Sequence, residues 1–244
     1  MTPTRSACPS IRSSRTAWLA ILAGLAAVSV LGLYAARGAT PGVPIPAPAV
    51  DDALAAGPTE TAVLSGGCFW GMQGVFEHVQ GVERVWAGYT GGAASTAHYD
   101  EVSTGTTGHA ESVQIVFNPR EVSYGQLLHV FFSVAHDPTE LDYQGPDVGT
   151  QYRSEVWYAD AAQRRIALAY IAQLGRAHVF PHPIVTRVDP LKGFYRAEAY
   201  HQDYLVHHPD QPYIVYNDLP KLANLRAMLP QMYRTRPVLV AANR

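Results

Sequence analysis

The sequence predicts an open two-layer sheet of the α+β or α/β class that is covered by helices. The chain has 244 residues, of which 48% are hydrophobic, and this is enough to bury a core. Short segments with strand patterns alternate irregularly with segments of helical spacing, which favours this class. No repeat with a period of about 20 to 50 residues is present, so a repeat architecture is not expected.

The predicted elements follow the chain in order. The first strand is expected over residues 61–65, and Gly66 and Gly67 then turn the chain into a helix that begins at Cys68. The helical spacing that predicts this helix is set by Phe69, Met72, Phe76 and Val79. The remaining strands are expected over residues 82–89, 110–117, 154–158 and 184–188. The remaining helices are expected over residues 124–134 after a Ser123 cap, 160–174 with Asp160 as cap, 197–207 and 219–228.

The first 39 residues are expected to direct export. Arg5, Arg12 and Arg15 come without any acidic residue before twenty uncharged, mostly apolar residues at 17–36. That length matches a membrane span, while small residues at 35–39 offer a site for a signal peptidase. A cleaved signal and a retained membrane anchor both stay open, and the flanking charges disfavour a buried core helix. Either export signal places the rest of the chain in the periplasm or another extracytoplasmic space.

The rest of the chain divides into a linker and one domain. Residues 40–58 are rich in proline, alanine and glycine, which favours an extended spacer over a packed element. Residues 59–244 are expected to form a single domain, with a monomer as the default and membrane contact only through residues 17–36. Lys+Arg 18 and Asp+Glu 20 nearly balance in the whole chain, which argues against nucleic acid as a partner.

The two cysteines, Cys8 and Cys68, are too few for a disulfide-stapled scaffold or a cysteine-rich zinc site. Cys68 lies in the run GGCFWG at 66–71, at the start of a predicted helix, where unpaired N–H groups and the helix dipole stabilise a thiolate. We therefore expect the pKa of the Cys68 thiol to be lowered and Cys68 to act as a nucleophile. Trp70 points away from the apolar stripe of this helix and is expected to line a groove for an apolar group. The alternative is a buried, unreactive cysteine.

Glu111 is the candidate acid. With the period of two expected over residues 110–117, it shares a face with the apolar residues Val113, Ile115 and Phe117. Burial there raises the pKa of a carboxyl group and keeps it protonated near neutral pH, as a general acid requires. Two alternatives stay open: Glu111 pairs with an arginine such as Arg153, or His109 on the same face is the acid.

Two glycine-rich segments each carry a candidate tyrosine. Tyr89 lies in residues 87–92 and Tyr152 in residues 145–154, where a phenol can reach a ligand atom, although both could be ordinary sheet residues. Neither segment has a phosphate-loop pattern. The ten histidines show no spacing typical of a metal site, so no metal is expected.

These motifs together resemble the A-type peptide methionine sulfoxide reductases. The matching runs are GCFWG at 67–71, GYTGG at 88–92, GHAE at 108–111, HDPT at 136–139 and GTQYRS at 149–154. The runs at 194–198 and 200–202 are similar to a later motif of that family. The resemblance covers roughly residues 60 to 234. It implies a two-layer α+β sandwich of ferredoxin-like type that reduces the S epimer of methionine sulfoxide, free or in proteins, without a bound cofactor.

The resemblance also implies a role for each site residue. Cys68 would attack the sulfoxide sulfur and become a sulfenic acid, and Glu111 would protonate the sulfoxide oxygen. The implied substrate-binding residues are Tyr89 and Tyr152 at the oxygen, Phe69 and Trp70 at the methyl group, and Asp147 on the polar side. Oxidised proteins or peptides that contain methionine sulfoxide would be the substrates, so the enzyme would repair oxidative damage.

The chain departs from many family members because it has no cysteine after Tyr213. Cys8 lies before the apolar segment, so we expect an external thiol to reduce Cys68 directly. That thiol would be a thioredoxin-like or glutaredoxin-like protein or a small thiol. The rival hypotheses are a cysteine hydrolase with His109 or His136 as base, and an exported module that binds peptides without catalysis.

Overall fold

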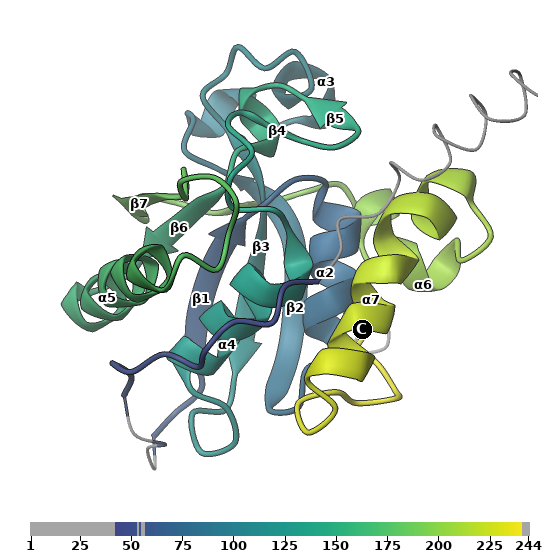
Figure 1. The fold of residues 1–244 in the computed structure, drawn as a ribbon. Coiled ribbons are helices and arrows are strands. Elements are labelled where there is room, and N and C mark those ends of the chain that lie inside the picture. Colours follow the sequence, from purple (N-terminus) through teal and green to yellow (C-terminus); the bar gives the residue numbers. More distant parts are fainter. Residues whose placement is uncertain (1–41, 53, 55–56, 241–244) are drawn as a thin grey trace, which may run out of the picture. The chain divides into compact units, whose positions relative to one another are not determined.

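A six-stranded mixed sheet forms the centre of the computed structural model, which describes residues 42–52, 54 and 57–240 (Figure 1). The strand order is β7-β6-β1-β3-β2-β8. Every neighbouring pair is antiparallel except β6 and β7, which are parallel. The strands are β1 Glu60–Ser65, β2 Val82–Thr90, β3 Ala110–Phe117, β6 Glu155–Tyr158, β7 Arg187–Pro190 and β8 Tyr195–Arg196.

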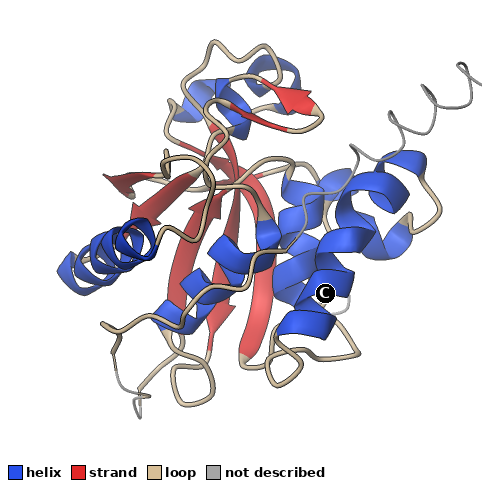
Figure 2. Ribbon diagram, viewed as in Figure 1, coloured by secondary structure: helices blue, strands red, loops and turns tan. Residues whose placement is uncertain are grey.

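The central part of this sheet has the ferredoxin-like arrangement. In chain order it is β1, helix α2 (Phe69–Glu77), β2, β3, helix α4 (Tyr124–Val130) and β6, and its strands lie in the order β6-β1-β3-β2. Helices α2, α4 and α5 (Ala161–Ala177) share one core cluster with the sheet face that they cover (Figure 2). The predicted two-layer α+β class is therefore confirmed.

Most predicted elements are present at or near their expected positions. Ser123 caps α4 in a capping box with Gln126, and a π-helix, η2 (Phe131–Ala135), continues α4. Asp160 caps α5 through the Gln163 N–H, and α7 spans Leu219–Met228 after a second π-helix, η5 (Ile214–Asp218). Strand β7 begins three residues later than the expected 184–188.

The helix predicted over residues 197–207 is wrong. The chain forms only a 3-10 turn at Ala199–His201 and the short helix α6 (Tyr204–His207). Between them Gln202 is extended and Asp203 is left-handed, with φ 54°. The side chain of Gln202 bonds the N–H and C=O of Ala87 in β2, at 3.0 Å each. These tertiary hydrogen bonds replace the helical ones that the local pattern favours.

Several short elements have too few residues to show a period and were not predicted. They gather beyond one end of the sheet, at the top of Figure 1. These are helix α3 (Tyr99–Val102), the hairpin strands β4 (Tyr143–Gln144) and β5 (Asp147–Val148), and the 3-10 helix η3 (Thr150–Tyr152).

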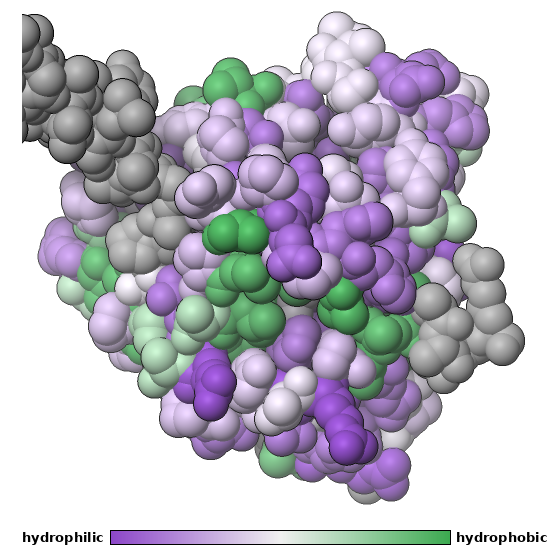
Figure 3. Space-filling view, turned by 90° about the vertical axis from the view of Figure 1, so that its right-hand side faces the viewer, coloured by the Kyte–Doolittle hydropathy of each residue, from purple (hydrophilic) through white to green (hydrophobic). Residues whose placement is uncertain are grey.

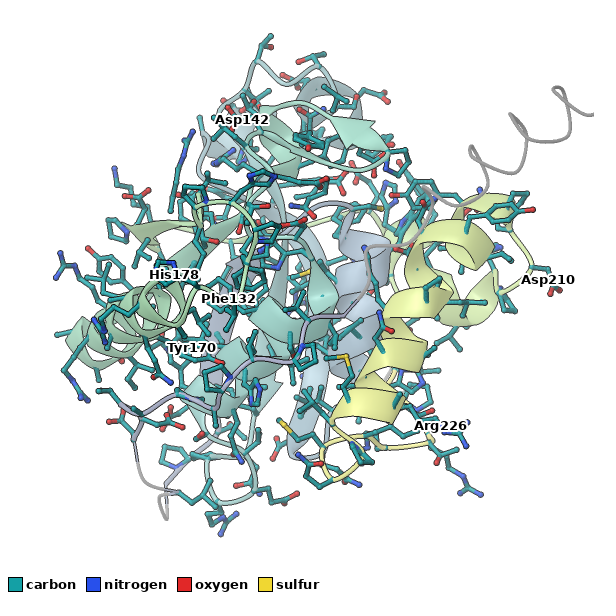
Figure 4. The ribbon with its side chains drawn as sticks, viewed as in Figure 1. Phe132, Asp142, Tyr170, His178, Asp210 and Arg226 are labelled. Carbon is teal, nitrogen blue, oxygen red and sulfur yellow. The ribbon has the colours of Figure 1, made fainter. Side chains whose placement is uncertain are left out.

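The described part of the predicted linker is extended but packed, so its interpretation as an unpacked spacer is wrong for residues 42–52. Its contacts with α4, η2 and α5 include Gly125 N–H to the Asp51 carboxylate at 2.9 Å, Val43 N–H to Ser133 O at 2.8 Å, and Tyr170 Oη to Pro46 O at 2.7 Å. The ring of Tyr170 meets that of Phe132 edge to face, with centroids 5.8 Å apart (Figure 4). Asp51 thereby lies at the N-terminus of α4, where the helix dipole favours an anion.

The face that carries α6 and α7 is mostly hydrophilic, and its apolar residues form small separate patches (Figure 3). Such a face suits contact with water. Among the described residues, no helix combines the length and apolar character that crossing a bilayer requires. Cys8 and the apolar run at residues 17–36, which is predicted to direct export, lie outside the described residues.

Candidate active site

Cys68 lies where β1 passes into α2 and is the N-cap residue of that helix. Gly66 and Gly67 make the turn, and Gly67 has φ +90°. A Cβ at Gly67 would lie 2.7 Å from Gln144 Cβ, and one at Gly66 would lie 2.9 Å from the ring of His136. The two glycines therefore let the β4-β5 hairpin and His136 close against the turn. Cys68 is a free thiol and only 9% exposed.

Glu111 lies beside Cys68, as the motif predicted. Its Oε2 accepts a hydrogen bond from the Phe69 N–H at 3.0 Å, in the first turn of α2. The side chain is buried in the face that also holds Val113 and Ile115. Burial raises the pKa of Glu111 to about 8, with smaller contributions from Asp147 and Asp218 and an opposing one from the Phe69 N–H. Glu111 is thus protonated at neutral pH.

Tyr89 and Tyr152 both lie near Glu111 but belong to different elements. Tyr89 pairs with Glu111 across β2 and β3, and its Oη donates to Glu198 Oε2 at 2.8 Å. Tyr152 ends η3 and is half-buried. The pKa of its phenol is raised by burial and then by the nearby charges of Glu111 and Asp147. Both phenols are therefore protonated donors at neutral pH.

An aromatic cluster surrounds Trp70, two residues after Cys68. The half-buried indole of Trp70 stacks on Tyr204 with centroids 3.8 Å apart and an interplanar angle of 9°. Its Nε1–H donates to His201 Nδ1 at 3.1 Å, and the ring of Tyr213 meets it edge-on. Phe69 is buried and lies 4.9 Å from the His201 ring.

Asp147 links the hairpin to this cluster. The Tyr213 phenol donates to its Oδ2, so strand β5 and the chain before η5 are joined. The pKa of Asp147 is raised by burial, against the effects of the Tyr213 hydrogen bond and the Lys221 charge. Asp147 therefore contacts the aromatic cluster through Tyr213, and its expected place on the polar side of the substrate stays a prediction.

The expected lowering of the pKa of Cys68 is wrong for this structure. Burial raises the pKa of the thiol well above its usual value, and the carboxylates of Glu111 and Asp218 raise it further. The backbone N–H of Trp70 acts in the expected direction but is outweighed. Asp218 packs against Gly71 in α2 and forms a buried ion pair with Lys221 at 3.3 Å. No sequence pattern marks this carboxylate as a neighbour of Cys68.

Several site residues were missed because no local pattern marks them. They come from α3 and from the irregular C-terminal segment, and they are Tyr99, Glu198, His201, Tyr204, Tyr213 and Asp218. Glu198 and His201 lie in runs that were noted as similar to a family motif but were given no role. Tyr99 lies close enough to Glu111 and Cys68 for their charges to raise the pKa of its phenol, after burial.

The alternatives that rest on histidine or arginine are not supported by the geometry. His109 Nδ1 accepts from Gly92 N–H at 3.2 Å and its Nε2 lies 2.9 Å from Ala93 O, so both nitrogens are used. His136 is likewise bonded at both nitrogens, by Phe131 O and Ser154 Oγ. Arg153 pairs with Glu155 at 2.6 Å rather than with Glu111. Across the described ranges, no three His, Cys, Asp or Glu side chains are grouped as a metal site would need.

Comparisons with known proteins find a matching family model and similar sequences. Residues 60–232 match the family model described as peptide methionine sulfoxide reductase. The peptide methionine sulfoxide reductase MsrA 2 of Mesorhizobium japonicum is 57% identical over 189 residues, which cover 78% of this chain and 97% of the relative. MsrA 2 of Synechocystis is 49% identical over 185 residues, covering 75% and 86%.

Two solved structures have a similar fold. Reduced Mxr1 from Saccharomyces cerevisiae has a TM-score of 0.57 and 29% identity, over 68% of this chain and 95% of that protein. Methionine sulfoxide reductase A of Corynebacterium diphtheriae has a TM-score of 0.53 and 33% identity, over 71% and 89%.

Proposed function

The chain belongs to the peptide methionine sulfoxide reductase family, and on that premise we propose which residues carry each step of its reaction. The enzyme reduces the S epimer of methionine sulfoxide to methionine with electrons from thiols, through a cysteine sulfenic acid. The observation that carries the assignment is the hydrogen bond from the Phe69 N–H to Glu111, which fixes a protonated carboxyl group beside Cys68.

Cys68 attacks the sulfoxide sulfur. Its Sγ takes over the oxygen as the S–O bond of the substrate breaks, so methionine leaves and Cys68 becomes a sulfenic acid. The substrate sulfur gains two electrons and the cysteine sulfur loses two. Glu111 donates its proton to the oxygen and takes up the proton of the Cys68 thiol, so it ends the step protonated.

The protonated state of Glu111 serves the attack in a second way. A carboxylate at this position raises the pKa of the Cys68 thiol, and protonation of Glu111 removes that charge. At neutral pH the acid is therefore present and the repulsion that opposes thiolate formation is smaller. Protonation of Glu111 therefore favours both ionisation of the Cys68 thiol and proton transfer to the sulfoxide oxygen.

The remaining residues orient the substrate. The phenol of Tyr152 donates to the sulfoxide oxygen, with Asp147 on the same polar side, and stabilises the charge that develops on that oxygen. The phenol of Tyr89 joins it when its O–H turns from Glu198 Oε2 to the substrate oxygen. Phe69 and Trp70 hold the methyl group, with the indole fixed by Tyr204 and His201. Because the oxygen and the methyl group contact different sets of residues, this arrangement selects one epimer.

An external thiol completes the cycle. It attacks the Cys68 sulfenic acid, water leaves, and a mixed disulfide forms; a second thiol then releases Cys68 and leaves as a disulfide. A thioredoxin-like or glutaredoxin-like protein or a small thiol supplies these electrons. This proposal is supported by the absence of any cysteine after Tyr213 and by Cys68 being a free thiol. After treatment with substrate, mass spectra of the protein should show a sulfenic acid or a thiol adduct; an internal disulfide would contradict it.

We also propose that the enzyme works outside the cytoplasm as a monomer. The support for export is the sequence of residues 1–39, in which Arg5, Arg12 and Arg15 precede the apolar run at 17–36. Cell fractionation followed by N-terminal sequencing would tell a cleaved signal from a retained anchor. Recovery of the full chain in the cytoplasm would contradict export.

One assay tests the central assignment. The protein is supplied with a dithiol and peptides that carry each epimer of methionine sulfoxide, and methionine formation is measured for wild type and Cys68→Ser. We expect activity on the S epimer that Cys68→Ser abolishes. Hydrolysis of an ester or amide without reductant would instead favour a cysteine hydrolase, and ligand binding retained by Cys68→Ser without turnover in wild type would favour a binding module.

A further inference from the structure

We infer that Arg153 is a positioning residue that holds Tyr89, Glu111 and Tyr152 in the arrangement that the reaction needs. The inference rests on the roles proposed above for those three side chains. Arg153 lies between η3 and β6 and is only 6% exposed. A buried guanidinium is costly unless its charge and its N–H groups are satisfied, so the use made of those groups indicates what Arg153 does.

The guanidinium bonds two backbone segments and one carboxylate. Its Nη2 donates to Gly108 O at 3.0 Å, and its Nη1 donates to His109 O at 3.2 Å and to Thr150 O at 2.9 Å. Its Nε donates to Glu155 Oε2 at 2.6 Å, which supplies the counter-charge. The planar guanidinium therefore donates four hydrogen bonds, which go to two backbone segments and one carboxylate.

A third backbone segment packs against the same guanidinium. Gly91 has φ +99°, and a Cβ at that position would lie 2.8 Å from Arg153 Nη2, 2.8 Å from the Trp157 ring and 2.9 Å from Gly108 O. The Trp157 ring also lies under the guanidinium, with the charged carbon 5.5 Å from its centroid. Gly91 thus allows the chain to pass directly over Arg153.

Each of the three segments carries one oxygen-side residue of the site. Gly91 lies two residues after Tyr89, His109 lies two residues before Glu111, and Thr150 begins the 3-10 helix that ends at Tyr152. Only two residues separate each backbone contact of the guanidinium from the site side chain. A displacement of that backbone therefore moves the site side chain by a similar amount. The segments are far apart in sequence, and Arg153 is a point at which all three meet.

Arginine suits this position for a geometric reason. Its planar fork offers donors in fixed directions, whereas the lysine ammonium is a compact point charge on a flexible stem. Lysine keeps the charge beside Glu155 but cannot reach the carbonyl groups of Gly108, His109 and Thr150 together. Arg153→Lys therefore separates loss of charge from loss of geometry.

The test compares Arg153→Lys with Arg164→Lys. Arg164 is exposed and lies 5.9 Å from the Tyr158 ring, so it is a matched control on the neighbouring helix. In folded Arg153→Lys, checked by thermal unfolding, we expect kcat to fall by about 10- to 100-fold while KM changes by less than about twofold. Arg164→Lys should match wild type. A wild-type kcat in folded Arg153→Lys would overturn the inference.

A second readout distinguishes positioning from mere stability. The titration of Glu111 is followed by the infrared band of its protonated carboxyl group, identified by its absence in Glu111→Gln. In Arg153→Lys we expect the midpoint to move down from about 8, because looser segments admit water to the carboxyl group. An unmoved midpoint would contradict a positioning role.

Further variants distinguish failure of this inference from failure of the proposed function. If Arg153→Lys does not fold, Arg153→Gln replaces it, since the amide keeps two N–H donors without a buried charge, and the same loss of kcat is expected. Wild-type kcat in that variant would again overturn the inference. If Glu111→Gln itself retains full activity, the proposed roles fail and the inference falls with them; if only the Arg153 variants are fully active, the roles stand and the inference alone fails.

Discussion

Two groups of residues near Cys68 are held in place in different ways. The oxygen side is the group proposed to bind the sulfoxide oxygen, and the methyl side is the group proposed to hold the methyl group. The oxygen side uses side chains fixed by strand pairing and backbone hydrogen bonds: Tyr89 lies opposite Glu111, and Glu111 is bonded to the N-terminus of α2. The methyl side uses rings from an irregular segment, where Tyr204 and His201 hold the indole of Trp70 by stacking and one hydrogen bond. The first side depends on the register of a sheet, and the second on ring packing and one side-chain hydrogen bond. Substitutions on the two sides should therefore affect different kinetic constants.

The largest effect is expected at Glu111. Glu111→Gln keeps an oxygen that can accept from the Phe69 N–H but has no proton to give, so kcat should fall by about 10²- to 10⁴-fold. Substrate affinity should change little, because the amide occupies the same space. Single-turnover formation of methionine measures the step. A decrease confined to KM would show that the oxygen side binds rather than catalyses.

The same substitution should change stability with pH. The pKa of Glu111 in the folded protein is raised to about 8 from an ordinary value of 4.5, so wild type loses stability as the pH rises from about 4.5 through about 8. Gln cannot ionise and avoids this loss. A pKa difference of about 3.5 corresponds to about 4.8 kcal/mol of stability. The Tm of Glu111→Gln minus that of wild type should be small at pH 5 and reach about 10–20 °C at pH 9, at about 2–4 °C per kcal/mol. Calorimetry at both pH values measures it, and equal differences would contradict burial of the charge.

The tyrosines offer a smaller test of the oxygen side. Tyr89→Phe and Tyr152→Phe each remove one donor to the developing charge, and each should lower kcat by about tenfold, or roughly 1.4 kcal/mol. The double variant should lose more than either single one. Tyr158→Phe, half-buried under Arg164, is the matched control and should keep wild-type kinetics. Full activity in the double variant would remove the phenols from the mechanism.

The methyl side should respond through KM. Trp70→Phe loses the hydrogen bond to His201 and part of the stack on Tyr204, so KM should rise by about tenfold with little change in kcat. Trp86→Phe is the control, because Trp86 stacks under Arg196 at 3.8 Å in a different part of the sheet. A fall in kcat without a rise in KM would erase the distinction between the two sides.

The smallest effect is expected far from both sides, in the packed segment at residues 42–52. Asp51→Ala removes an anion and an acceptor from the N-terminus of α4 and should cost about 1 kcal/mol of stability. Kinetic constants should stay at wild-type values. Asp52→Ala is the control, since its ion pair with Arg165 is half exposed and worth little. Equal unfolding temperatures for the two variants would show that the segment adds nothing to the fold.

The sequence by itself determined the long elements and the oxygen side of the site. Alternating apolar residues place Glu111 on the buried face of its strand, and burial alone predicts the direction in which its pKa moves. Cys68 was placed at a helix start by two glycines and a helical pattern. These inferences are local, since they depend on residues within one or two turns or strands of each other.

Only the tertiary structure decided what surrounds those residues. Burial of Cys68 reverses the pKa shift that the helix start predicts, and nearby carboxylates add to the reversal. One of these carboxylates is Asp218, which is 150 positions away in the chain. Gln202 leaves the helical pattern because its hydrogen bonds reach β2, and this break sets the path of the segment that carries His201 and Tyr204. Periodicity reports which face of an element is buried, but long-range electrostatics and packing depend on which elements meet, and that is fixed only when the chain folds.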